Sequence, residues 1–150
     1  MVICCDTSFL FSVYGNDANT SRALTYLKKT QSPLTVSILN GFELANALRL
    51  AEFRKLIAPG NAELLLGEYH RDLEDRRIVE YPCNLASLFK HAHRLSEDHT
   101  VRKGHRGFDI LHVATALEIG ANDFLTFDRV QSRLAQVLNL KTPLKVDLHA

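Results

Sequence analysis

Residues 108–128 read FDILHVATALEIGANDFLTFD, an apolar run of helical length followed by a shorter apolar run. The spacing predicts a helix over residues 108–119 that ends at Gly120, a residue typical of helix C-termini. Residues 124–127 then predict a buried strand that ends at Asp128. A helix that leads directly into a buried strand is the repeating unit of α/β proteins with a parallel sheet.

The same alternation continues along the rest of the chain. Short runs rich in apolar and β-branched residues predict further strands, and apolar residues at helical spacing predict amphipathic helices. The predicted strands are 2–5, 34–38, 78–81 and a last one at 144–146; the other predicted helices are 17–29, 41–56, 61–76, 85–95 and 130–138. This order predicts an α/β sandwich around a mostly parallel sheet.

Composition narrows the class of protein. The chain has 150 residues, of which 46% are hydrophobic and 23% charged, so a single domain over residues 1–150 with a buried core is expected. Eighteen Lys and Arg residues against seventeen Asp and Glu give a net charge of +1. This balance excludes a histone-like nucleic-acid binder and an acidic solvating chain, but it leaves a local basic patch open.

Localisation is predicted from three features. The longest uncharged stretch, residues 30–42, contains several polar residues, so no membrane-spanning segment is expected. The apolar N-terminus lacks the basic flank of a signal peptide. The three cysteines, Cys4, Cys5 and Cys83, form no CxxC pair and lack partner ligands for zinc, so a cytoplasmic, reducing compartment is predicted.

Four acidic residues lie next to predicted strand ends or helix starts. Asp6 follows the first strand, and Asp128 follows the strand of residues 124–127. Glu43 lies in the first turn after the second strand, and Asp109 begins the helix of residues 108–119. Ligands of parallel sheets bind outside the carboxyl ends of the strands, so these side chains are expected to meet at one edge.

Each acid alone has an ordinary explanation as a helix cap or a first-turn residue. Together, however, four carboxylates repel one another unless a cation lies among them, and Mg²⁺ and Mn²⁺ prefer such oxygen ligands. These ions polarise phosphates and activate water for in-line attack. Polar side chains that can support the carboxylates are nearby: Thr7, Ser8 and Thr126, the last predicted to share a strand face with Asp128.

Four segments carry these acids, namely residues 5–10 (CDTSFL), 43–48 (ELANAL), 108–117 (FDILHVATAL) and 125–128 (LTFD). Their order and spacing resemble those of the PIN domain, most closely the VapC-like toxins of type II toxin–antitoxin pairs. The third segment is the most specific. Many relatives carry a further acid after the fourth segment, where this chain has Arg129-Val130-Gln131, so the number of metal ions, one or two, stays open.

The resemblance implies a three-layer α/β/α sandwich and endoribonuclease activity that depends on Mg²⁺ or Mn²⁺. Asp6 and Asp109 would be the primary metal ligands. Glu43 and Asp128 would complete the catalytic site through a water or a second ion, and Thr126 would supply a supporting hydroxyl. The resemblance also implies an RNA substrate, a homodimer, and inhibition by a cognate antitoxin bound against the early helices.

A basic segment follows the predicted helix of residues 85–95. Residues 99–106 contain Arg102, Lys103 and Arg106 and no acid. One interpretation is a solvated loop. The other is a basic rim, kept mobile by neighbouring glycines, that binds RNA phosphates beside the metal site.

The same residues also fit other interpretations. His112, one turn after Asp109, is predicted to be a packed or hydrogen-bonded helix histidine, with support of a carboxylate as the alternative. A haloacid-dehalogenase-type phosphotransferase also begins with an aspartate after a strand, but Ser8 stands where its second acid is expected. The sequence has no GxxxxGK[ST] motif, which excludes a P-loop NTPase. The main alternative is a catalytically silent PIN-like module that binds RNA or protein, against which the four intact acids argue.

Overall fold

In the computed structural model, which describes residues 1–146, four short strands form one sheet in the order β3-β2-β1-β4. Every pairing is parallel, and Cys4 at the centre of the sheet aligns with Thr35 on one side and Phe124 on the other. The strands are β1 (Ile3–Cys5), β2 (Leu34–Val36), β3 (Ile78–Glu80) and β4 (Asp123–Leu125).

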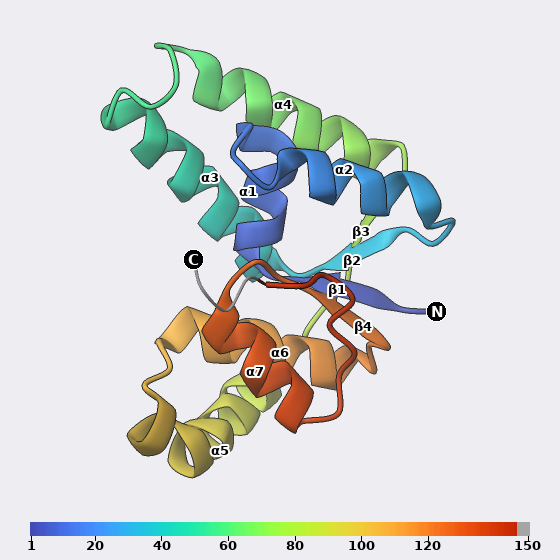
Figure 1. Ribbon diagram of the computed structural model, residues 1–150, viewed down its shortest axis with the longest axis vertical. Coiled ribbons are helices and arrows are strands. Elements are labelled where there is room, and N and C mark those ends of the chain that lie inside the picture. Colours follow the sequence, from blue (N-terminus) through green and yellow to red (C-terminus); the bar gives the residue numbers. More distant parts are fainter. Residues whose placement is uncertain (147–150) are drawn as a thin grey trace.

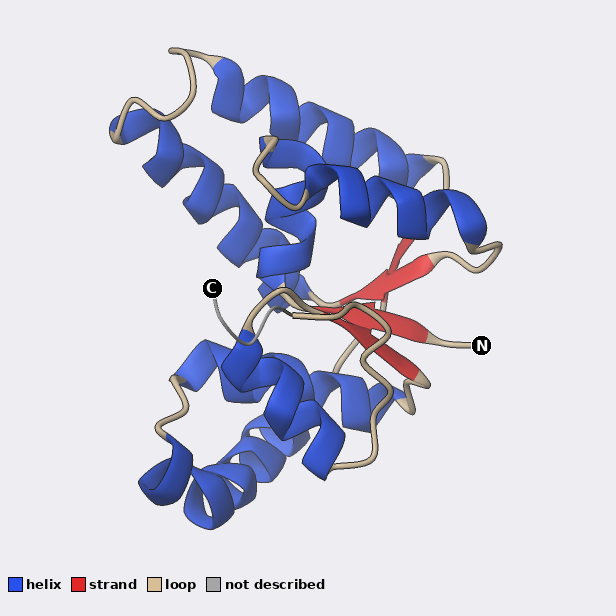
Figure 2. Cartoon of the chain, in the orientation of Figure 1, coloured by secondary structure: helices blue, strands red, loops and turns tan. Residues whose placement is uncertain are grey.

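Helices cover both faces of this sheet. Figure 1 shows that one face carries α1 (Thr7–Gly15), α2 (Thr20–Lys29), α3 (Ile38–Phe53) and α4 (Asn61–Glu74). The opposite face carries α5 (Leu85–Lys103), α6 (Gly107–Ile119) and α7 (Arg129–Val137). The sheet is therefore the middle layer of three, as Figure 2 also shows, and the predicted α/β/α sandwich is confirmed.

The core is divided by the sheet because successive strand residues point to opposite faces. Cys5 packs with Leu10, Leu44 and other side chains beneath α1 to α4. Cys4 packs on the other face with Val113 and neighbours from α6 and α7. Both cysteines are buried and free, as the sequence predicted.

The connections place a topological switch point beside β1. The chain leaves β1 and builds β2 and then β3 on one side, and later returns to the other side of β1 as β4. In open parallel sheets the crevice outside the carboxyl ends at such a point is where ligands bind. Asp6 directly follows β1, and Thr126 directly follows β4, so both lie at this crevice.

Two predicted boundaries near Glu43 are wrong. The strand expected over residues 34–38 ends at Val36, and α3 begins at Ile38 instead of residue 41. Ser37 starts the helix early, because its hydroxyl accepts a hydrogen bond from Leu39 N while the Asn40 side chain accepts one from Ser37 N. Glu43 therefore lies in the second turn of α3, one turn later than predicted.

Two further boundaries differ from the prediction. The helix expected to end near residue 95 continues to Lys103 and ends at Gly104, whose φ of 69° is the left-handed conformation that glycine adopts readily. Residues 144–146 do not form the predicted last strand; an isolated bridge between Lys141 and Asp123 takes its place. Within residues 1–146, no helix is both long and apolar enough to span a membrane.

Candidate functional site

Asp6 is the most buried of the four predicted acids. It caps the N-terminus of α1, where its Oδ1 accepts a hydrogen bond of 3.1 Å from Phe9 N. Ser8 Oγ donates to the same carboxylate at 2.8 Å, and Thr126 Oγ1 donates to Oδ2 at 2.7 Å. The side chain has no exposed surface. The carboxylate is thus held in one orientation by donors from two sides of the switch point.

Burial also changes the acidity of Asp6. Loss of solvent raises its pKa from 3.8 to about 6, although the hydrogen bonds from Thr126, Phe9 and Ser8 act in the opposite direction. Any cation that enters the site would stabilise the ionised form of this buried carboxylate.

Asp109 lies in the first turn of α6 and faces Asp6 across one side chain. The amide nitrogen Nε2 of Gln131 donates to Asp6 Oδ2 at 2.8 Å and to Asp109 Oδ1 at 3.0 Å. On its outer side Asp109 accepts a hydrogen bond of 3.0 Å from the Nε atom of Arg106. Asp109 is 9% exposed, so α6 and α7 together bring it to the buried edge where Asp6 lies.

Asp128 fixes the start of α7. Its Oδ1 accepts a hydrogen bond of 2.8 Å from Gln131 N, and its Oδ2 lies 4.0 Å from Nη2 of Arg106. Because β4 ends at Leu125, Thr126 and Asp128 share a loop and not the strand face predicted for them. Thr126 Oγ1 accepts from Asp128 N at 2.9 Å while it donates to Asp6. This hydroxyl therefore links the two acids.

Glu43 reaches the same edge from α3 and binds His112 of α6, with 3.0 Å between Oε1 and Nε2. His112 is 2% exposed, and its Nδ1 lies 3.5 Å from Asn40 Nδ2. Burial raises the pKa of Glu43, but hydrogen bonds from His112 and Thr7 outweigh it and hold the pKa below its ordinary value. His112 is thus a hydrogen-bonded helix histidine that also supports a carboxylate, which joins the two interpretations left open by the sequence.

One pocket of about 530 Å³ is lined by the acids predicted from the sequence: Asp6, Glu43, Asp109 and Asp128. Within residues 1–146, however, no three Asp, Glu, His or Cys side chains have the spacing of a ready-made metal site. The reason is visible in the contacts. Gln131 lies between Asp6 and Asp109, Arg106 approaches Asp109 and Asp128, and Glu43 turns toward His112.

The donor set nevertheless fits a hard divalent cation. Its oxygens are carboxylate and hydroxyl oxygens, which Mg²⁺ and Mn²⁺ prefer. Two of the carboxylate oxygens, on Asp6 and Asp109, lie within 3.0 Å of the same nitrogen atom. Ligand oxygens of one Mg²⁺ are each about 2.1 Å from the ion, so a modest approach of these two carboxylates suffices.

The sequence profile of the PIN domain matches residues 3–137. The chain belongs to the PIN domain family. The resemblance drawn from the four acidic segments is therefore confirmed at the level of the family. No curated protein sequence matches the chain significantly.

Solved structures show the same fold. The VapC20 toxin of Mycobacterium tuberculosis, described as cleaving the sarcin–ricin loop, is 20% identical with a TM-score of 0.65, over 87% of this chain and 93% of that one. FitAcB from Neisseria gonorrhoeae is 18% identical with a TM-score of 0.59, over 90% and 94%. FitAB bound to a DNA fragment is 16% identical with a TM-score of 0.67, over 99% and 100%.

The predicted basic rim of this PIN domain is divided into two parts. Arg106 contacts the acids, whereas Arg102 and Lys103 lie in the last turn of α5. These two residues line a groove of about 660 Å³ between α5 and α7, together with Arg133, which the sequence analysis did not select. The expectation of a mobile basic loop is therefore wrong for Arg102 and Lys103, because α5 extends through them.

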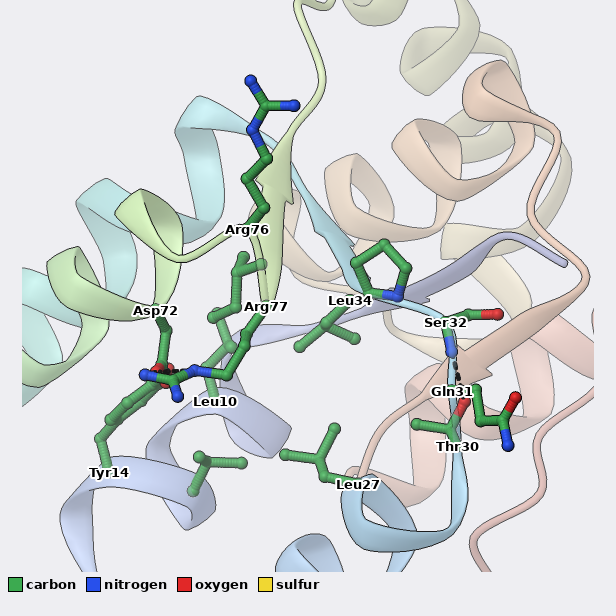
Figure 3. A pocket seen from close by; sticks show the side chains of 13 residues that line it. Leu10, Tyr14, Leu27, Thr30, Gln31, Ser32, Leu34, Asp72, Arg76 and Arg77 are labelled. Carbon is green, nitrogen blue, oxygen red and sulfur yellow. Dashed lines mark hydrogen bonds and ion pairs between the residues drawn. The ribbon is translucent and has the colours of Figure 1, made fainter.

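Figure 3 shows a separate cavity of the PIN domain, about 380 Å³. It lies at the starts of β2 and β3, whereas Asp6 follows the end of β1. Leu34 and Ile78, the first residues of β2 and β3, line it. Asp72 in this cavity already accepts hydrogen bonds from Tyr14 at 2.5 Å and from Arg77 at 2.8 Å. The Asp72 carboxylate is therefore already paired, and the cavity is remote from the four acids. This cavity has no part in the candidate site.

Two side chains of the site are not predicted from the sequence. Gln131 is noted there only as part of the segment that differs from the fourth motif of relatives, and Asn40 is not named as a site residue. Asn40 is 2% exposed and donates from Nδ2 to the Cys5 carbonyl at 3.1 Å. A polar residue on an otherwise buried helix face was the available signal for both.

Proposed function

We propose that this PIN domain is a metal-dependent endoribonuclease, the toxin of a type II toxin–antitoxin pair. The observation that carries the proposal is that carboxylate oxygens of Asp6 and Asp109 both accept hydrogen bonds from one nitrogen atom, Gln131 Nε2, at the switch point. Glu43 and Asp128 line the same pocket. Asp6 and Asp109 would hold Mg²⁺ or Mn²⁺, and the other two acids would complete the ligand set directly or through water.

The ion supplies polarisation of the phosphodiester and a lowered pKa of bound water. The chain's own residues supply the rest. Ser8 and Thr126 orient the Asp6 carboxylate. Glu43, kept ionised by His112, would face the ion from the wall of the pocket, directly or through a water. Arg106, whose side chain is 80% exposed, would bind a substrate phosphate at the rim.

Several features support RNA as the substrate and a protein as the inhibitor. The groove lined by Arg102, Lys103 and Arg133 lies between α5 and α7, and the first turn of α7 carries Gln131 of the site. The cations of this groove suit a phosphate backbone. The fold is shared with a toxin that cleaves the sarcin–ricin loop and with the FitAB proteins. A cognate antitoxin, a homodimer and a cytoplasmic location are parts of this proposal.

The test is cleavage of RNA by purified protein with Mg²⁺ or Mn²⁺ against EDTA, beside the Asp6→Asn and Asp109→Asn variants. The proposal expects cleavage that requires the ion and falls at least about a hundredfold in each variant, since each removes a charged ligand. Full activity in EDTA or in either variant would remove the assignment. Addition of a cognate antitoxin is expected to stop cleavage.

The silent PIN-like module remains the second candidate, because no three acidic, His or Cys side chains within residues 1–146 are spaced as a ready-made metal site. It predicts RNA or protein binding with neither metal uptake nor cleavage. Calorimetric titration with Mn²⁺ separates the two: measurable binding that is lost in Asp6→Asn favours the nuclease, and no binding favours the module.

A further inference from the structure

Gln131 occupies the centre of the acidic pocket. It lies in the first turn of α7 and is 4% exposed, and its Nε2 donates to both Asp6 and Asp109. The other atom of the same amide, Oε1, is buried and has no hydrogen-bond partner among the described residues. A neutral side chain therefore joins the two most buried acids while one of its own polar atoms is left unsatisfied.

This arrangement is costly in a folded protein. A buried carbonyl oxygen without a hydrogen-bond partner destabilises the folded state. Buried polar atoms that stay unpaired call for an explanation, and a missing ion is one of those recognised. Here the unpaired oxygen belongs to a side chain that already touches both primary acids, so a cation at this position could take both carboxylates and this oxygen as ligands.

The amide can present either of its atoms to the acids. The terminal torsion of glutamine has broad, roughly two-fold minima, so a half-turn exchanges Nε2 and Oε1 without moving the backbone. After that turn, the amide oxygen lies where the nitrogen was, between the carboxylates of Asp6 and Asp109. Amide carbonyls are accepted ligands of hard divalent cations.

We propose that Gln131 is a direct ligand of the divalent cation, with an amide that donates to Asp6 and Asp109 when the ion is absent and turns its Oε1 toward the ion when it binds. The proposal rests on the proposed function, because it assumes that Asp6 and Asp109 take up the ion. It adds to that function a third, neutral metal ligand from α7, in the segment Arg129-Val130-Gln131, which contains no acid.

A purely structural role gives the opposite result in a binding experiment. If Gln131 only bridges the acids as a donor, it competes with the ion, and its removal leaves affinity unchanged or increases it. If Gln131 is a ligand, its removal weakens binding. The sign of the change in Kd thus separates the two roles.

The first experiment is calorimetric titration of Mn²⁺ into wild-type protein, Gln131→Met and the control Gln136→Met. Methionine matches the length of glutamine and lacks the amide, and Gln136 is an exposed glutamine of the same helix. We expect Gln131→Met to bind about tenfold more weakly or worse, with Gln136→Met unchanged. Wild-type affinity or tighter binding in Gln131→Met would overturn the ligand role while leaving the proposed function intact. Absence of binding to wild-type protein would overturn both.

The second experiment needs no variant that could fail to fold. The side-chain amide of Gln131 in ¹⁵N-labelled wild-type protein is followed by NMR during addition of diamagnetic Mg²⁺. We expect its NH₂ resonances to shift strongly, because both hydrogen bonds to carboxylates are broken, while those of Gln136 stay in place. Unchanged Gln131 resonances at a Mg²⁺ concentration that saturates the site would contradict the turn of the amide.

Discussion

The Nε2 atom of His112 lies 3.0 Å from the Oε1 atom of Glu43, although the two residues are 69 positions apart. The contact joins α6 to α3 across the carboxyl edge of the sheet. His112 is nearly fully buried, whereas the Glu43 side chain is 32% exposed. A histidine in the interior thus holds an acid whose other side faces the pocket.

Replacing this histidine is expected to cost stability. His112→Phe removes the donor and leaves Glu43 half-buried without it, so the free energy of unfolding should fall by about 1–3 kcal/mol. The pKa of Glu43 should rise, because burial is then less opposed. Urea denaturation measures the first effect and an NMR titration of the Glu43 carboxyl the second.

His91 provides a matched control. Its Nδ1 lies 3.0 Å from Glu118 Oε1, the same separation, but the pair is at the surface. His91→Phe should change the free energy of unfolding by less than about 1 kcal/mol. Equal losses of unfolding free energy in the two variants would show that burial of the His112–Glu43 pair adds nothing to stability.

Asp6 predicts a pH dependence of stability in the metal-free protein. Its pKa is about 6 in the folded state against 3.8 ordinarily, so the folded state keeps a proton that the unfolded chain has released between these values. The free energy of unfolding should therefore fall as pH rises from about 4 to about 6, by on the order of 3 kcal/mol from this group alone. Denaturation in EDTA across this range measures the effect.

Comparison with Asp6→Asn isolates that contribution, because the variant cannot titrate at this position. Its stability relative to wild type should increase over the same pH range. A wild-type curve parallel to that of Asp6→Asn would mean that Asp6 titrates normally.

Arg106 should contribute to RNA affinity and only weakly to the stability of the fold. Its side chain is 80% exposed, so Arg106→Gln should change the free energy of unfolding by less than about 1 kcal/mol. RNA affinity, measured by fluorescence anisotropy in EDTA, should fall, and the slope of log K against log salt should become shallower by about one. Arg49→Gln, in the surface pair with Glu63, is the control that should alter neither. Identical salt slopes for the two variants would place the phosphate path elsewhere.

Ser37 should stabilise the helix that presents Glu43. Ser37→Ala removes the side-chain half of its capping box and is expected to cost about 1 kcal/mol or somewhat more, since Ser37 is fully buried. Asn19 holds the equivalent position of α2 but makes no side-chain cap hydrogen bond, so Asn19→Ala should cost less. Thermal denaturation of both variants compares the two, and equal effects would contradict the capping role.

The sequence was sufficient for the features that depend on local pattern. The apolar runs before Asp6 and before Thr126 are each specified by neighbouring residues, and the parallel pairing of β1 with β4 then brings their carboxyl ends to one edge. The predicted place of Thr126 within the strand is wrong, but Thr126 still supports a carboxylate of the site. It lies just beyond β4 and not within it, yet it meets Asp6 because β4 and β1 are neighbours.

The rest depends on contacts that a single sequence does not contain. The β-branched run at residues 35–38 suggested a longer strand, but Ser37 caps a helix there and moves Glu43 into the second turn. The pattern of α7 marks Gln131 as a polar residue on a buried helix face but does not give its partners; its place between Asp6 and Asp109 is set by how α7 packs against α6 and the sheet. Arg133 joins the α5–α7 groove for the same reason, as α5 extends to Lys103.

The most direct test of the account is a crystal structure of the wild-type protein grown with Mn²⁺, with the ion located by its anomalous scattering. The account predicts a peak about 2.2 Å from carboxylate oxygens of both Asp6 and Asp109, with Glu43 and Asp128 facing it. A fully occupied peak at another site, or none at this edge at millimolar Mn²⁺, would contradict the claim that these four acids form a metal centre.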